Sequence, residues 1–208
     1  MTDVTHGAGA RFYGMDRDSE LELVRRVSDG DTAAFDTVYA MFNGRLFGFL
    51  ARLARSRDVA QDLLEETWLR FVAHAGRLDA ETRLGPWLFT VARNLHVSYC
   101  RSRAMEDSRA IDAVGLWPAG LLASPFEETA ANELERRIEA ALATLPTAFR
   151  EVLLLVGVEG LRPAEAAVVC GITPEALRQR LSRARALLAQ RLEESALRPA
   201  RTFREVRS

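Results

Sequence analysis

The sequence contains no lysine, and all 28 of its basic residues are arginine, set against 29 acidic residues in a chain of 208. It has only two cysteines, too few for a disulfide scaffold and consistent with a reducing cytosol. No apolar run approaches the ~20 residues that a membrane span needs. Residues 1–18 also lack the apolar segment of a signal peptide. These absences exclude an integral membrane protein, and they predict a cytoplasmic protein with no membrane insertion.

The charge is nearly balanced overall but unevenly distributed along the chain. The net charge of −1 and the pI of about 6.3 argue against a uniformly basic nucleic-acid binder. Residues 16–36 carry −4 and residues 57–67 carry −3, whereas residues 84–103 carry +3 and residues 161–192 carry +4. The alternation predicts separate surfaces for separate partners. A high-GC genome explains the arginine bias more simply than selection does, yet each arginine is a planar fork suited to phosphates and base edges.

Hydrophobic residues recur at helical spacing throughout, and no stretch alternates convincingly like a strand. Ser19 and Glu22 have the spacing of a capping box, at the start of a helix that Gly30 would end. Three further helices are expected over residues 35–53, 58–74 and 86–103. The pattern therefore predicts an all-α fold in which residues 16–103 form a four-helix bundle.

Residues 104–127 interrupt the helical pattern and contain Gly115, Pro118 and Gly120. A stretch of this length without regular structure is improbable inside one compact domain, so we expect a flexible linker. Helical periodicity returns over residues 128–194, where shorter helices should form a second domain. The sequence thus predicts two small helical domains joined by a linker.

The expected helix over residues 58–74 has an apolar face and, opposite it, an acidic face. Asp62, Glu65 and Glu66 surround Leu69 on the acidic face at 100° per residue. An exposed leucine ringed by carboxylates suits a basic, partly apolar partner. A solvated acidic face with one stray leucine is also common, so both interpretations stay open at this point.

The expected helix over residues 86–103 presents arginine, aromatic and amide side chains on its outward side. Arginine binds phosphates, an aromatic ring stacks on bases and an amide reads base edges, which together make a surface for single-stranded DNA. An ordinary polar face with Trp87 packed into the bundle fits the pattern equally well. The outward residues are Trp87, Thr90, Arg93, Asn94, Val97 and Arg101.

Residues 161–185 have the spacing of a helix-turn-helix motif. Gly171 stands where the tight turn needs a positive φ, and Ile172 follows it as a buried plug. Thr173 and Pro174 suit the cap and the first turn of a second helix, whose outward face would meet the major groove. That outward face carries Glu175, Arg178, Gln179, Ser182 and Arg183.

The sequence has no pattern typical of an active site: it lacks a glycine-rich phosphate loop, a nucleophile elbow and paired catalytic carboxylates. His96 and Cys100 stand four apart on one expected helix, but no further ligand pair accompanies them, so a structural role is favoured over a zinc site. Cys170 fits a small core residue. We therefore expect a protein that is not an enzyme and that needs neither a metal nor a cofactor.

Four segments resemble, in the same order, the extracytoplasmic-function sigma factors of bacterial RNA polymerase. Residues 60–70 (AQDLLEETWLR) resemble the polymerase-binding helix, and residues 86–95 (PWLFTVARNL) resemble the segment that melts and reads the minus-ten promoter element. Residues 145–161 resemble the entry to the fourth conserved region, through LP at 145–146, REVLLL at 150–155 and EGL at 159–161. Residues 178–185 (RQRLSRAR) resemble the recognition helix for the minus-thirty-five element.

The resemblance implies a transcription initiation factor that directs core polymerase to promoters and assists promoter melting. Residues 16–103 would then be the region-two-type domain, residues 104–127 the linker and residues 128–194 the region-four-type domain. The implied partners are the clamp of core RNA polymerase, promoter DNA as duplex and as melted strand, and an anti-sigma protein. The polymerase-binding residues would be Asp62, Leu63, Glu65, Glu66 and Leu69, while the two outward faces described above would contact the minus-ten and minus-thirty-five elements.

Three departures from the family pattern put the base preference in doubt, but not the binding. Val168 stands where the family usually has a glutamate, Arg162-Pro163 replaces a serine and an aromatic, and residues 173–175 are an unusual start for the recognition helix. Two rival interpretations remain. A stand-alone helix-turn-helix regulator would normally dimerise and would need no acidic face around Leu69. A sigma mimic that binds an anti-sigma protein would not need outward arginines on the recognition helix.

Overall fold

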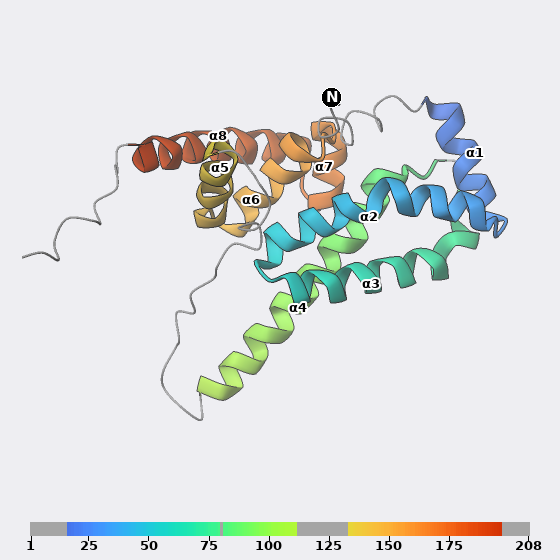
Figure 1. Cartoon of the computed structure of the whole chain (residues 1–208), viewed down its shortest axis with the longest axis horizontal. Helices are drawn as coiled ribbons and strands as arrows, with labels where there is room; N and C mark the ends of the chain where they lie inside the picture. The colour runs from blue at the N-terminus through green and yellow to red at the C-terminus, as the bar shows by residue number, and fades with distance from the viewer. Residues whose placement is uncertain (1–15, 80, 112–132, 197–208) are drawn as a thin grey trace, which may run out of the picture.

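The structure is a computed structural model that describes residues 16–79, 81–111 and 133–196. Within these ranges it consists of helices, turns and bends, without a strand, which confirms the expected all-α fold (Figure 1). The N-terminal half contains α1 (Arg17–Ser28), α2 (Thr32–Ala54), α3 (Arg57–His74), a short 3-10 turn η1 (Ala75–Arg77) and α4 (Leu84–Ile111). The C-terminal half contains α5 (Glu133–Thr144), α6 (Thr147–Leu153), a π-helical turn η2 (Leu154–Val158), α7 (Pro163–Cys170) and α8 (Pro174–Ala196).

The apolar stripes of α2, α3 and α4 meet in the core of the N-terminal half. Phe42 and Phe49 from α2, Phe71 from α3 and Phe89 from α4 are each fully buried. The rings of Phe49 and Phe89 pack edge to face with their centroids 5.3 Å apart. Full burial of such a side chain stabilises the fold by about 1.5–3 kcal/mol, so these four rings make a large contribution to the stability of the bundle.

The start of α1 differs from the capping box that Ser19 and Glu22 predicted. Asp16 is the N-cap, and its carboxylate accepts hydrogen bonds from the Ser19 amide at 2.8 Å and from the Ser19 hydroxyl at 3.0 Å. Aspartate caps a helix as well as serine does, and its negative charge also interacts favourably with the helix dipole, so the helix begins earlier. The helix ends at Ser28, and Gly30 follows in the turn with a φ of +84°.

Glu20 on α1 fixes the start of α4 from across the bundle. Its side chain is buried, and Oε1 accepts a hydrogen bond of 3.0 Å from the backbone amide of Leu84, the first residue of α4. Oε2 lies 2.7 Å from Arg83 Nε and 3.1 Å from Arg17 Nη1. The carboxylate therefore satisfies one orphan N–H of α4 and positions the helix that carries the candidate minus-ten residues.

Replacing Glu20 by glutamine should lower the free energy of unfolding by about 1–3 kcal/mol, because a buried carboxylate with charged hydrogen bonds is lost. Urea denaturation measures this change. Glu22→Gln is the matched control, since Glu22 forms only an exposed pair with Arg25 and should cost less than about 1 kcal/mol. Equal losses for the two variants would contradict the anchoring role of Glu20.

The first part of the expected linker is helical. α4 runs to Ile111 instead of ending near Arg103, so residues 104–111 of the stretch predicted as linker continue the helix. This part of the prediction was wrong because these residues include no glycine or proline, and the first breaker is Gly115. Residues 112–127, the rest of the predicted linker, lie outside the described part of the chain, as do residues 128–132 of the predicted second domain.

The helix-turn-helix motif forms as expected from α7 and α8. Gly171 ends α7 with a φ of +64°, the left-handed conformation that the tight turn requires. Ile172 is half-buried and packs against the core instead of being fully buried. The Thr173 hydroxyl accepts a hydrogen bond of 3.2 Å from the Ala176 amide, and Pro174 opens α8.

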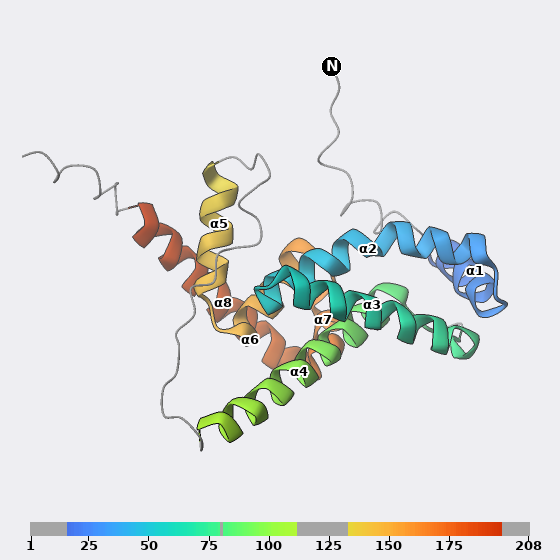
Figure 2. The same cartoon turned by 60° about the horizontal axis from the view of Figure 1, so that its bottom comes forward.

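The two halves pack against each other, which the sequence did not predict. α4 contacts α7, and α2 contacts α6, and one cluster of buried apolar residues continues from the N-terminal half into the C-terminal half (Figure 2). The C-terminal part of α4 projects beyond this body (Figures 1 and 2). Among the described residues, none of the helices is both long and apolar enough to span a bilayer.

Candidate polymerase and promoter interfaces

The acidic face of α3 is exposed where the sequence predicted a docking surface. Leu69 is 66% exposed, Asp62 and Glu65 are exposed, and Glu66 is half-buried with Oε1 2.9 Å from Arg70 Nε. Leu63 was wrongly placed in this set. Its side chain is 8% exposed and packs into the core, because it lies on the same face of α3 as the buried side chains at positions 60, 64, 67 and 71.

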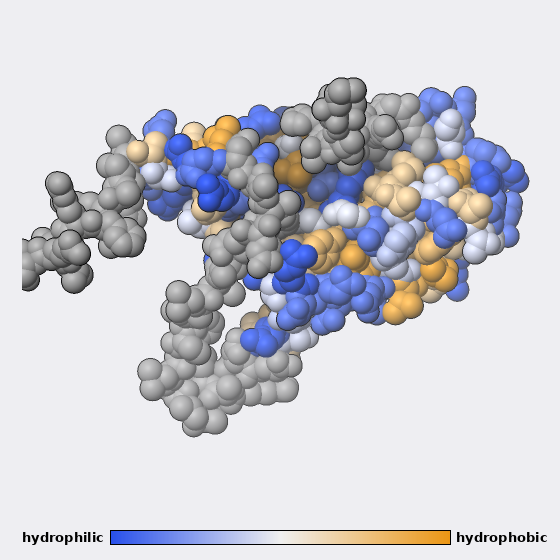
Figure 3. Space-filling view, in the orientation of Figure 1, coloured by the Kyte–Doolittle hydropathy of each residue, from blue (hydrophilic) through white to orange (hydrophobic). Residues whose placement is uncertain are grey.

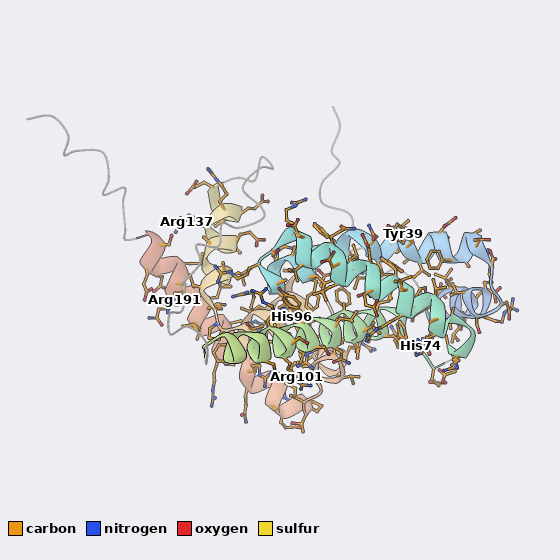
Figure 4. The ribbon with its side chains drawn as sticks, turned by 90° about the horizontal axis from the view of Figure 1, so that it is seen from below. Tyr39, His74, His96, Arg101, Arg137 and Arg191 are labelled. Carbon is orange, nitrogen blue, oxygen red and sulfur yellow. The ribbon has the colours of Figure 1, made fainter. Side chains whose placement is uncertain are left out.

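Two further exposed hydrophobic residues, one on α3 and one on α2, were not predicted from the sequence. Val72 lies one helical turn beyond Leu69 on α3 and is 57% exposed. Tyr39 on α2, labelled in Figure 4, is 42% exposed. Its ring centroid lies 4.8 Å from that of Trp68. Hydrophobic residues lie among hydrophilic ones on the surface over α2 and α3 (Figure 3). The spacing of three between Leu69 and Val72 was the available signal for a broader apolar surface, which we call the docking face: Tyr39, Asp62, Glu65, Glu66, Leu69 and Val72.

Most of the candidate minus-ten residues lie together along α4. Asn94 and Arg101 are exposed, and Thr90 and Val97 are half-buried. The Thr90 hydroxyl donates a hydrogen bond of 2.7 Å to the carbonyl oxygen of Pro86 in the preceding turn. Asn94 and Arg101 are therefore the side chains of this set most accessible to a DNA strand.

Trp87 is partly a core residue, as one of the two interpretations of this side chain expected, and its role toward DNA stays a prediction. It is half-buried, and its ring packs edge to face against Phe71 with centroids 5.7 Å apart. The centroid of the His74 ring lies 6.1 Å from that of Trp87. Loss of the Trp87 ring would remove packing from the bundle as well as the predicted stacking platform.

Arg93, another candidate minus-ten residue, pairs with a glutamate of the C-terminal half. Its Nε donates a hydrogen bond of 2.8 Å to Glu151 Oε1 on α6, and the Glu151 side chain is only 7% exposed. Sequence reasoning placed Arg93 on an outward face, because the packing of a distant helix against α4 has no signature in the local pattern.

His96 and Cys170 are buried, whereas Cys100 is exposed. His96, labelled in Figure 4, is 4% exposed. Cys100 Sγ lies 3.6 Å from its Nε2. Burial lowers the pKa of His96, and the positive charges of Arg150 and Arg93 lower it further. Burial raises the pKa of Cys100, and burial together with the charge of Glu151 raises the pKa of Cys170 to about 12. Within the described residues no three potential metal ligands gather at one point.

The stability of the protein should fall below about pH 6.5 because of His96. A histidine whose pKa is lower in the folded chain binds its proton more readily in the unfolded chain, where the pKa is about 6.5. The contribution is complete above that pH and is lost as the pH falls, by at most about 1.4 kcal/mol per pH unit. Urea denaturation from pH 7.5 to 5 should show a steeper loss for wild type than for His96→Gln. The exposed His74→Gln is the control, and an unchanged slope in His96→Gln would contradict this assignment.

The recognition face of α8 is exposed as expected. Leu177, Leu181 and Ala184 are buried on the inner side. Glu175 and Arg178 form an exposed ion pair of 2.7 Å near the start of the helix. The outer side, which we call the recognition face, consists of Glu175, Arg178, Gln179, Ser182 and Arg183, all exposed. These features define the class: an all-helical protein with a helix-turn-helix motif whose second helix has an exposed outer face.

The family follows from comparison with known proteins. The Sigma-70 region 2 model matches residues 38–105, and the Sigma-70, region 4 model matches residues 135–188. The RNA polymerase sigma factor CarQ of Myxococcus xanthus is 34% identical over 178 residues, which are 86% of this chain and 100% of that protein. The ECF RNA polymerase sigma factor EcfG of Rhodopseudomonas palustris is 38% identical over 144 residues, 69% of this chain and 77% of that protein. The chain belongs to the extracytoplasmic-function sigma factors.

Two solved structures share the fold. The sigma factor RpoE in complex with the anti-sigma factor NepR from Bartonella quintana has a TM-score of 0.65 and 27% identity, and the match covers 76% of this chain and 96% of that one. CnrH in complex with the cytosolic domain of CnrY has a TM-score of 0.63 and 22% identity, and the match covers 86% of this chain and 99% of that one. Sigma factors are regulatory initiation factors.

Proposed function

We propose that this chain directs core RNA polymerase to specific promoters and assists the opening of promoter DNA there. The observation that carries the proposal is the exposure of two chemically different surfaces on one chain. The docking face is acidic and apolar, whereas the recognition face carries two arginines and a glutamine. They lie in the segments that match the second and fourth sigma-70 regions.

The docking face suits the clamp of core polymerase. Leu69 and Val72 offer exposed apolar area, and Asp62, Glu65 and Glu66 supply negative charge around it. An apolar centre with a charged rim is the usual anatomy of a specific protein interface. The negative rim selects a basic partner and speeds the encounter with it.

The recognition face suits duplex DNA, and the exposed side of α4 suits a melted strand. Arg178 and Arg183 can donate to guanine or to phosphates, and Gln179 can pair with adenine in the major groove. Asn94 can hydrogen-bond to the edge of an unstacked base, and Arg101 can neutralise a nearby phosphate. Strand opening would draw its energy from the capture of unpaired bases, without covalent chemistry by this chain.

The near-neutral charge of the chain fits a factor that depends on polymerase. Phosphate contacts dominate nonspecific affinity for DNA, and a net charge of −1 makes that affinity weak for the free chain. When polymerase holds both DNA-binding surfaces at the right separation, binding of the second element becomes effectively intramolecular. We expect the protein in the bacterial cytoplasm, where polymerase and the chromosome are, with an anti-sigma protein as its inhibitor.

A mobility-shift assay with a promoter fragment tests the proposed function. Core polymerase with this chain should form a promoter-specific complex that survives excess nonspecific DNA, whereas the chain alone should not. A specific complex with the chain alone, at similar affinity, would instead support a stand-alone regulator. Binding to polymerase without any promoter selectivity would support a sigma mimic.

A further inference from the structure

A hollow of about 420 Å³ opens at one end of the N-terminal half, where the turn between α1 and α2 meets the end of α3. This end of the bundle lies at the right of Figure 1. Val72 belongs both to the wall of the hollow and to the docking face. The end hollow, as we call it, is lined among others by Val27, Asp31, Thr32, Phe35, Val72 and Gly76.

The interior of the end hollow is apolar, and its walls are held by packing. Val27 is buried, and Phe35 is half-buried against the core. The centroid of the Phe35 ring lies 5.9 Å from that of Trp68 and 6.3 Å from that of Tyr39. Since Tyr39 belongs to the docking face, one group of packed rings supports both surfaces. An apolar side chain that enters the end hollow therefore meets a wall that is already formed, so little ordering is needed on binding.

The mouth of the end hollow is open at a glycine and acidic at its rim. Gly76 is exposed, and a Cβ there would meet the Ser28 carbonyl oxygen at 3.9 Å, an ordinary contact. Asp31 Oδ2 lies 2.6 Å from Arg26 Nη2, and Asp31 Oδ1 accepts hydrogen bonds from two amides in the first turn of α2. Residues 16–36, which include this rim, carry −4 in total. An apolar hollow with an acidic rim suits an apolar side chain that has basic neighbours.

Leu69, Val72 and Gly76 follow one another along α3 and the short turn after it. Spacings of three and four residues place side chains on the same side of a helix. Leu69 and Gly76 are separated by two helical turns, which is about 11 Å at the rise of an α-helix. A partner helix that lies along α3 can therefore place one apolar side chain on Leu69 and another, two turns away, in the end hollow.

The position of the end hollow points to the same partner as the docking face. A specific interface engages about 20–30 residues on each protein, which is more than the docking face contains. The docking face is therefore too small to be the whole contact surface, and the end hollow adjoins it through Val72. The residues that dominate binding energy at such interfaces are large side chains that fill pockets on the partner.

We propose that core RNA polymerase inserts a large apolar side chain, carried on a basic helical segment, into the end hollow while that segment lies along α3. The inference rests on the proposed function, because it extends the assignment of the docking face. The turn between α1 and α2 thereby becomes part of the polymerase-binding surface. The apolar walls bind the inserted side chain, and the acidic rim attracts the basic residues that flank it.

Gly76→Leu tests the proposal by filling the end hollow from its own wall. Fluorescence anisotropy with the full chain measures its association with core polymerase. The affinity should fall by at least about tenfold, because the polymerase can no longer bury one large apolar side chain there. Gly76→Ala should have a smaller effect, since a methyl group fills little of the space.

Gly157→Leu is the matched control. Gly157 is also an exposed glycine with open space around its Cα, but it lies in η2, in the C-terminal half. The same substitution there should change the affinity by less than about twofold, as is usual for a surface site outside the interface. Circular dichroism checks that both leucine variants keep the helices of the wild type.

Thr32→Trp fills the end hollow from a different element and should also weaken binding. Thr32 is exposed at the first residue of α2, so this variant keeps the test informative if Gly76→Leu alters the turn after α3. Affinities for polymerase equal to that of the wild type in both variants would overturn the proposal. If sedimentation then showed that the wild type self-associates and that either variant does not, the end hollow would be a contact between two copies of this chain.

Leu69→Asp, measured beside these variants, separates failure of this proposal from failure of the proposed function. If Leu69→Asp weakens binding to polymerase and neither filling variant does, the docking face stands and the end hollow is not part of the interface. If the wild type itself does not bind core polymerase, the proposed function fails and this inference fails with it.

Discussion

Leu69→Asp is expected to weaken association with core polymerase by more than ~2 kcal/mol, about 30-fold in affinity, because it places a charge at the apolar centre of the docking face. Asp62→Arg and Glu66→Arg should act in the same direction by reversing the rim charge. The fold should survive, since Leu69 is 66% exposed. Fluorescence anisotropy with labelled protein measures the affinity, and circular dichroism checks the helices.

Leu134→Asp is the matched control for this prediction. Leu134 on α5 is 58% exposed, close to the value for Leu69, but it lies in the other half of the protein and outside the docking face. It should leave the affinity for polymerase unchanged within about twofold. If Leu69→Asp binds polymerase as well as Leu134→Asp does, α3 is not the docking element.

The second prediction with a large expected effect distinguishes the recognition face of α8 from the exposed side of α4. Arg178→Ala should weaken formation of the closed promoter complex by about 1–3 kcal/mol, because it removes a contact to a base edge or phosphate in the duplex. Asn94→Ala should leave duplex binding nearly intact but reduce promoter opening. Permanganate reactivity of thymines around the start site measures opening, and a filter-binding assay at low temperature measures the closed complex.

Arg191→Ala is the control for Arg178, since Arg191 also lies exposed on α8 in an ion pair but near the other end of the helix (Figure 4). Trp87→Ala is less informative than Asn94→Ala, because the Trp87 ring packs against Phe71 and its loss would destabilise the bundle. If Asn94→Ala and Arg178→Ala reduced duplex binding equally and opening never occurred, a stand-alone regulator would explain the data better.

The features visible in the sequence were those that depend on nearby residues. The period of the apolar stripe predicted α2 and α3 within a few residues, and Gly171, Thr173 and Pro174 predicted the turn of the helix-turn-helix. The acidic face around Leu69 was likewise predicted from spacing along a single helix.

The features that the sequence could not provide depend on contacts between distant residues or on a choice between similar local signals. Asp16 and Ser19 both suit a helix cap, and only the structure shows which of them accepts the amide hydrogen bond. Glu20 reaches Leu84 across 64 residues, and Arg93 reaches Glu151 across 58. Neither pair leaves a periodic signature, so the anchoring of α4 and the packing of the two halves emerged only from the fold.

Run-off transcription with purified core polymerase tests whether this chain acts as a sigma factor through its docking face. The templates would be sheared genomic DNA, and three reactions would be compared. One contains no sigma factor, one contains this chain, and one contains its Asp62→Arg/Leu69→Asp variant. We expect transcripts with discrete start sites that depend on the wild-type chain and are lost with the variant. Discrete transcripts that are equally abundant with the variant would contradict the role of the docking face. The absence of any transcript that depends on this chain would contradict the proposed function.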